Sequence, residues 1–82
     1  MLDLQSYDEV LDFLEVLFQK NILEPKYIQE MNFILDGCRK EKMVAIRAID
    51  SCFMEYRQKN QDYRGPTPEE QEIWKQLFNV WQ

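Results

Sequence analysis

The sequence of 82 residues contains no histidine, only two glycines and only two cysteines. Without histidine the chain has no imidazole to serve as a base, a proton relay or a metal ligand near neutral pH. Two glycines are also too few to build the glycine-rich loops that bind phosphate groups through backbone amides. These shortages argue against most nucleotide-binding enzymes, against hydrolases that depend on an imidazole base, and against transition-metal sites.

The two thiols, Cys38 and Cys52, indicate a reducing compartment. A secreted domain of this size usually carries more cysteines, and two cysteines without histidine cannot complete a four-ligand zinc site. The first residues lack the basic and apolar regions of a secretory signal. The most apolar run, residues 10–18, is interrupted by two carboxylates and is shorter than the ~20 residues that span a bilayer. We therefore expect reduced cysteines in a cytoplasmic protein with no membrane segment.

The charge is acidic and unevenly distributed. Lys and Arg total 10 against 15 Asp and Glu, which gives a net charge of −5 and a pI near 4.6. This balance argues against non-specific binding to nucleic acid or to an anionic membrane. Six acids and one base lie in residues 1–24, whereas seven bases and five acids lie in residues 25–60. The acidic segment is expected either to neutralise the basic one within the protein or to face a basic partner.

Two helices are predicted from their start signals. Ser6 and Glu9 have the spacing of a capping box, in which a hydroxyl and a carboxylate bind free amides of the first turn. A helix is therefore expected over 7–20. The segment 67–70, Thr-Pro-Glu-Glu, repeats this signal with a proline at the first helical position, and it predicts a helix over 68–81.

Two further helices are predicted in the middle of the chain. Pro25 suits the first position of a helix, and Gly37 can adopt the left-handed conformation that ends one, so a helix is expected over 25–36. After a short polar turn, a third helix is expected over 41–60. A glycine tolerated inside a helix would instead fuse the two into one rod over 25–60.

Four amphipathic helices with short connections predict an all-α fold, a small four-helix antiparallel bundle forming a single domain over 1–82. The bundle has three helices if the middle segment is continuous through Gly37. Apolar residues cover about 220° of the first helix and leave a narrow polar stripe. That stripe consists of Asp8, Asp12, Glu15 and Gln19. Such a helix either lies centrally in the bundle or presents apolar surface to a partner.

The inventory of reactive groups is small, and we predict that the protein is not an enzyme and holds no cofactor or metal. The serine and threonine hydroxyls that could act as nucleophiles are Ser6, Ser51 and Thr67, of which two are already assigned as helix caps. A cysteine nucleophile would have no histidine to accept its proton. Asp8, Asp12 and Glu15 lie on one face of the first helix, as a catalytic pair of carboxylates would. A polar stripe that only faces solvent has the same spacing, so the pattern does not indicate catalysis.

The first candidate binding surface is a line of four residues on the third predicted helix. Met43, Arg47, Asp50 and Met54 follow the spacing i, i+4, i+7, i+11, nearly opposite the expected core. Flexible methionines beside an arginine are common in contact surfaces. The alternative interpretation is an ordinary exposed face, or a core wider than the pattern suggests.

Three further candidates lie outside this line. Phe33 falls about 150° from the apolar stripe of its helix, where an aromatic ring is either covered by another helix or exposed for contact. Trp81 lies in a last turn that is expected to fray, so it is an anchor for a partner if it does not dock on the protein itself. Tyr63 and Arg64, in the predicted loop 61–66, form a possible recognition pair or pack on the end of the bundle.

The leading functional interpretation is a small acidic protein-binding module that acts by docking, as an inhibitor, adaptor or immunity-type regulator. Self-association as a homodimer is a variant of it. A second interpretation is a helix-turn-helix DNA-binding regulator, with Phe33, Met43 and Ile46 at packing positions. Its phosphate and base contacts would come from Arg39, Lys40, Lys42 and Arg47. The net charge makes nucleic acid the less favoured partner. A third interpretation is a small structural subunit of a larger assembly.

Overall fold

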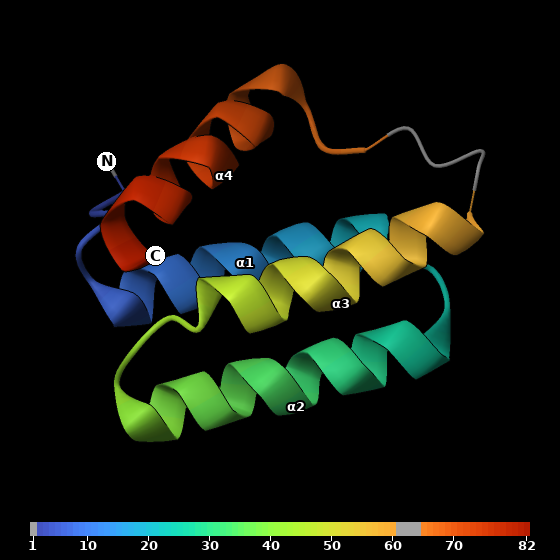
Figure 1. Ribbon diagram of the computed structural model, residues 1–82, viewed down its shortest axis with the longest axis horizontal. Helices are drawn as coiled ribbons and strands as arrows, with labels where there is room; N and C mark the ends of the chain where they lie inside the picture. The colour runs from blue at the N-terminus through green and yellow to red at the C-terminus, as the bar shows by residue number, and fades with distance from the viewer. Residues whose placement is uncertain (1, 61–64) are drawn as a thin grey trace.

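The computed structural model describes residues 2–60 and 65–82. Within them the chain forms four α-helices and no strand, so the predicted all-α four-helix bundle is confirmed. The helices are α1 (Tyr7–Asn21), α2 (Pro25–Glu41), α3 (Ile46–Lys59) and α4 (Pro68–Trp81). Figure 1 shows α1, α2 and α3 running alternately back and forth, with α4 inclined over them on the side away from α2. Over the described residues no helix has both the length and the apolar character needed to cross a membrane.

The predicted start positions of α1 and α4 are confirmed, but only half of the capping box predicted at Ser6 and Glu9 forms, because the amide of Ser6 donates to the carbonyl of Asp3 at 3.1 Å. The hydroxyl of Ser6 accepts a hydrogen bond from the amide of Glu9 at 3.4 Å. Thr67 and Glu70 form a complete capping box, in which each side chain accepts from the other residue's amide, at 3.2 and 3.0 Å. These contacts satisfy amides that have no partner within the helix and fix where both helices begin.

The prediction that Gly37 ends the second helix is wrong. Helix α2 continues through it to Glu41, because the extra turn brings Cys38 into the same buried stripe as Leu35. The helix ends instead at Lys42, which adopts the left-handed conformation with φ 56° and ψ 45°. The alternative of one rod over 25–60 is wrong as well, because residues 42–45 form a turn before α3 begins at Ile46.

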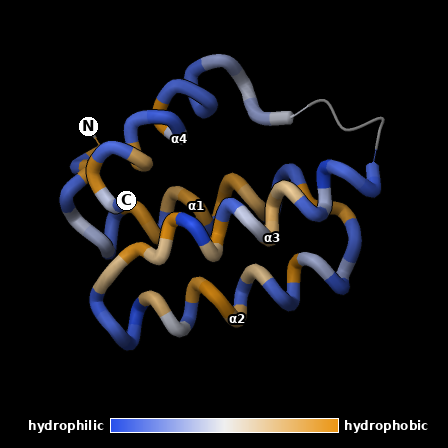
Figure 2. Tube along the Cα trace, viewed as in Figure 1, coloured by the Kyte–Doolittle hydropathy of each residue, from blue (hydrophilic) through white to orange (hydrophobic). Residues whose placement is uncertain are grey.

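The core lies between α1, α2 and α3. Figure 2 shows hydrophobic and hydrophilic residues alternating around the turns of each helix, as amphipathic helices require. Helix α1 is the most deeply buried and contributes Val10, Leu11, Leu14, Leu17 and Phe18. The wide apolar surface predicted for this helix is thus used largely inside the bundle, although Val16 remains 58% exposed.

Helix α4 is held by fewer buried side chains than the other helices. Leu77 is its only fully buried residue. The ring of Trp74 makes edge-to-face contacts with Phe18 and Phe53, at centroid distances of 6.0 and 6.2 Å. Glu70 also forms an ion pair with Lys20 of α1 at 2.7 Å. Aromatic contacts and a surface ion pair therefore attach α4 to the three-helix core.

Candidate functional site

Phe33 lies on the outer face of α2, opposite the stripe that α2 buries. Its side chain is 81% exposed, the highest value among the large hydrophobic residues that the structure describes. The fourth helix does not cover it, because α4 packs on the far side of the bundle (Figure 1). The sequence left open whether another helix covers the Phe33 ring or the ring is exposed, and in the structure it is exposed.

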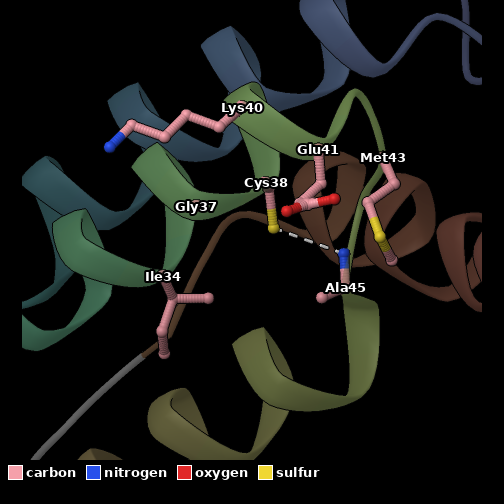
Figure 3. Close-up of a pocket in the computed structure, with 7 residues that line it drawn as sticks. All are labelled: Ile34, Gly37, Cys38, Lys40, Glu41, Met43 and Ala45. Carbon is pink, nitrogen blue, oxygen red and sulfur yellow. Dashed lines mark hydrogen bonds between the residues drawn. The ribbon is translucent and has the colours of Figure 1, made fainter.

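An apolar hollow of about 240 Å³ opens beside the C-terminal part of α2. It is lined by Ile34, Gly37, Cys38, Lys40, Glu41, Met43 and Ala45. Figure 3 shows the sulfur of Cys38 pointing into the space between Ile34 and Ala45, whereas Lys40 extends away from it. Gly37 follows Phe33 by one helical turn, and a Cβ atom at this position would meet nothing within 4 Å. The missing side chain leaves the surface open between the Phe33 ring and the hollow.

The turn between α2 and α3 forms one wall of this hollow. The Sγ atom of Cys38 accepts a hydrogen bond from the amide of Ala45 at 3.4 Å, and the amide of Met43 donates to the carbonyl of Cys38 at 3.1 Å. Val44 is buried and anchors the turn. Met43 is 43% exposed and also lines a second hollow, of about 190 Å³, together with Arg47. A flexible thioether thus lies between two shallow apolar depressions.

The line of four residues predicted on the third helix is only partly present. Met43 does not belong to a helix, because α2 extends to Glu41 and α3 begins three residues later than Met43. Arg47, Asp50 and Met54 do lie on α3, and Met54 is 40% exposed. Asp50 is half-buried, and loss of solvent raises the pKa of its carboxyl group although the nearby Arg57 opposes the shift.

Trp81 docks on the protein itself. Its indole nitrogen donates a hydrogen bond to the carbonyl oxygen of Leu4 at 2.7 Å, and its ring is half-buried against the core. The condition under which Trp81 would be a free anchor is therefore not met. The other aromatic candidate, Tyr63, and its neighbour Arg64 lie outside the residues that the structure describes.

The acidic stripe of α1 faces Arg39 of α2. The guanidinium lies 3.0 Å from Asp12, 3.2 Å from Glu15 and 3.7 Å from Asp8. Burial alone would lower the pKa of Arg39, but the hydrogen bond to Asp12 and the three carboxylates outweigh it and raise that pKa. Of the two roles considered for the acidic segment, neutralisation within the bundle is the one that this contact fulfils.

This contact also bears on the four cations considered for DNA recognition. Arg39 is engaged by three carboxylates, whereas Lys40, Lys42 and Arg47 are exposed. Helices α2 and α3 lie side by side and antiparallel (Figure 1). In a helix-turn-helix the two helices cross at about 90–120°. Neither the charge nor the crossing of this helix pair provides a specific observation in favour of DNA binding.

The described residues offer little reactive chemistry. Burial raises the pKa of the Cys52 thiol to about 11, with further contributions from Glu30 and Glu55. The thiol is therefore protonated near neutral pH, and the thiolate is the reactive form. Cys38 is also buried, and both cysteines are free thiols. Over the described ranges no group of three or more Cys, Asp or Glu side chains is placed to hold a metal ion.

The sequence pattern identified Phe33 but missed the hollow beside it. Gly37 drew attention only for its effect on helix length, either as the end of a helix or as a glycine tolerated inside a longer one. A better signal was available in its spacing from Phe33, since a glycine one turn after an aromatic residue on an outer face leaves a gap next to that ring. Met43 and Ala45 of the turn at 42–45 form one wall of the hollow. The sequence pattern predicted this turn earlier in the chain, between helices over 25–36 and 41–60.

The chain matches no model of a known protein family, and the searches of curated proteins and of solved structures gave no match.

Proposed function

We propose that this protein is a small cytoplasmic protein-binding module, an inhibitor, adaptor or regulator that acts by docking and performs no chemistry of its own. The observation that carries the proposal is the 81% exposure of Phe33 beside an apolar hollow. We call this region the Phe33 surface. It comprises Phe33, Gly37, Ile34, Met43 and Ala45.

The energy of an exposed phenylalanine supports this proposal. Burying such a side chain fully is worth about 1.5–3 kcal/mol, and in water that free energy is not gained. Aromatic side chains entering pockets of a partner supply much of the affinity of protein interfaces. Single exposed aliphatic residues are normal on monomers. The Phe33 surface differs from these because Gly37, one helical turn from the exposed ring, lines the hollow and leaves its edge open.

The shape of the hollow favours a protein over a small molecule. Its volume of about 240 Å³ is below the ~300–1,000 Å³ of typical ligand pockets. Such pockets also carry a few convergent polar groups, whereas here Lys40 extends away from the space and the carboxylate of Glu41 is the one charged group drawn beside Cys38 (Figure 3). A shallow apolar depression beside a projecting ring is better suited to a side chain presented by another folded surface.

The proposal is tested by placing a photo-reactive amino acid at position 33 in cells and identifying the crosslinked protein. Leu23 provides a matched control, because it is 79% exposed and lies outside the Phe33 surface. The captured protein is then purified and its affinity measured for the native chain and for Phe33→Ser and Leu23→Ser. We expect adducts at position 33 only, and loss of binding in Phe33→Ser only.

Equal labelling at positions 23 and 33, or equal binding by both serine variants, would contradict the proposal. If the captured protein belongs to a large complex and the chain is present in it stoichiometrically, the module serves as a structural subunit. Retention on a labelled DNA duplex library at low salt, without any protein adduct, would instead support the nucleic-acid interpretation.

A further inference from the structure

The outer face of α2 carries a symmetric arrangement of charge and size. Phe33 and Gly37 lie two residues on either side of Leu35, and Glu30 and Lys40 lie five residues on either side of it. All four side-chain positions are exposed. A large residue is thus matched with the smallest one, and a negative residue with a positive one, about the same midpoint.

Such an arrangement is complementary to itself in one orientation. When two identical helices pack antiparallel about a two-fold axis level with Leu35, each residue meets the one equally far from the midpoint on the other helix. Phe33 of each copy then faces the gap at Gly37 of the other. Glu30 of each copy faces Lys40 of the other, which gives two ion pairs by symmetry.

We infer that the partner of the Phe33 surface is a second copy of this chain, bound through antiparallel pairing of α2. This inference rests on the proposed docking function and names its occupant. The two surfaces bury both exposed rings, and no like charges oppose each other at the four positions. Parallel pairing in register would place Glu30 against Glu30 and Lys40 against Lys40, so the charges select the antiparallel orientation.

Glu30 and Lys40 do not pair with each other within one chain. Ten residues separate Glu30 from Lys40, which corresponds to about 15 Å along the helix axis, too far for an ion pair. Within the described residues neither side chain takes part in an ion pair. Their charges are therefore available to a neighbouring molecule.

The dimer is expected to be weak. Helix α2 has 17 residues and a length of about 25 Å. One helix face of this length buries less than the ~800 Å² per partner of a standard stable interface. We expect a dissociation constant between ~10 µM and ~1 mM, a concentration range accessible to sedimentation equilibrium.

The test is a charge-reversal cycle read by sedimentation equilibrium. Glu30→Lys alone and Lys40→Glu alone each replace two attractive pairs with two repulsive ones, and we expect each to raise the dissociation constant about tenfold. The double variant Glu30→Lys with Lys40→Glu restores both pairs across the two-fold axis. We expect its dissociation constant to return to within about threefold of the native value.

Two further variants test the packing of the ring. Phe33→Ser should abolish the dimer. Gly37→Gln fills the gap but replaces a helical glycine with a better helix former, so it should weaken dimerisation about tenfold while leaving the melting temperature of the monomer unchanged or higher. This variant separates loss of the interface from loss of the fold.

Five results would overturn the inference. A native chain that is monomeric up to ~1 mM contradicts self-pairing. A double reversal no tighter than either single variant contradicts the antiparallel register, and normal dimerisation by Gly37→Gln contradicts the placement of the ring. A dimer unaffected by Phe33→Ser lies on another face and also removes support for the Phe33 surface. If the chain is monomeric but still forms Phe33-dependent adducts with another protein, the inference that the partner is a second copy is wrong. The proposed docking function is then still supported.

Discussion

The indole nitrogen of Trp81 lies 2.7 Å from the carbonyl oxygen of Leu4 and donates a hydrogen bond to it across 77 positions of sequence. This bond joins the last turn of α4 to the segment before α1. It gives the end of a helix a polar contact in addition to the packing of the ring. A residue near a fraying helix end is thereby held in one place.

Replacing Trp81 should loosen α4. We expect Trp81→Phe to lower the free energy of unfolding by about 1–1.5 kcal/mol, because the carbonyl of Leu4 loses its donor. Trp81→Ala should lower it by about 3 kcal/mol, at the low end for such truncations because the ring is only half-buried. Urea unfolding followed by circular dichroism measures both values. Equal effects of the two variants would show that the hydrogen bond contributes little.

Glu70 should make stability depend on pH in the acid range. The hydrogen bond that it accepts from Lys20, followed by that from the amide of Thr67, lowers the pKa of the carboxyl group below its ordinary value of 4.5. A lowered pKa in the folded state means that the stabilisation is complete above the unfolded-state pKa. It is lost as the pH falls through the folded-state pKa.

The variant Glu70→Gln isolates this effect. The amide can still accept from Thr67, so the capping box is kept while the charge facing Lys20 is removed. We expect about 0.5–1 kcal/mol of destabilisation near neutral pH, and none at a pH below the folded-state pKa of Glu70. Thermal unfolding of both proteins over an acid pH series provides the comparison. A constant difference at every pH would mean that the charge is not the cause.

Gly37→Ala should stabilise the monomer. The position lies inside α2, and an added Cβ meets no atom within 4 Å. Alanine is favoured over glycine within helices by about 0.5–1 kcal/mol. We expect a gain of this size in urea unfolding at low protein concentration, where the proposed dimer does not contribute. A loss of stability would indicate a contact at this position that the helix surface does not show.

Lys42→Gly should also stabilise the fold. Lys42 ends α2 with φ 56°, a left-handed conformation that costs an L-residue with a Cβ about 1–2 kcal/mol. Glycine removes this cost but gains freedom in the unfolded chain, so we expect a net gain of about 0.5–1 kcal/mol. Thermal unfolding measures it, with Lys75→Gly as the opposite control. Lys75 lies inside α4, where glycine should cost about 1 kcal/mol.

Arg39→Gln should destabilise the protein at low salt. It removes the guanidinium that faces Asp8, Asp12 and Glu15 and leaves these carboxylates to repel one another. Because the carboxylates are largely exposed, we expect a loss of about 0.5–1.5 kcal/mol in low salt. The loss should shrink at about 1 M salt, where screening is strong. Urea unfolding at the two salt concentrations tests this, with exposed Lys75→Gln as a control expected to change little.

The start signals and the apolar periodicity sufficed to predict the fold class. The caps at Ser6 and Thr67 act locally, so they can be recognised from a few neighbouring residues. The end of α2 could not be predicted in this way. There, burial of Cys38 and Val44 outweighs the local preference of Gly37 to end a helix, and the turn shifts to a lysine.

At the candidate site, too, features set by the local sequence were predicted and features set by distant contacts were not. The exposure of Phe33 followed from its angular position on the helix, which depends only on the sequence around it. Met43 was misplaced because its position depends on where the preceding helix ends. The docking of Trp81 on Leu4 depends on a contact between the two ends of the described fold, which no local pattern contains.

The uneven burial of the helices divides the molecule into parts of different rigidity. Leu77 is the only side chain that α4 buries completely, whereas α1 buries five. Regions with few buried apolar contacts open at lower free energy than the whole molecule. Amide protons of α4 should therefore exchange with solvent through a partial opening that leaves α1, α2 and α3 assembled, and the aromatic rings of Phe18 and Phe53 would become transiently accessible in that state.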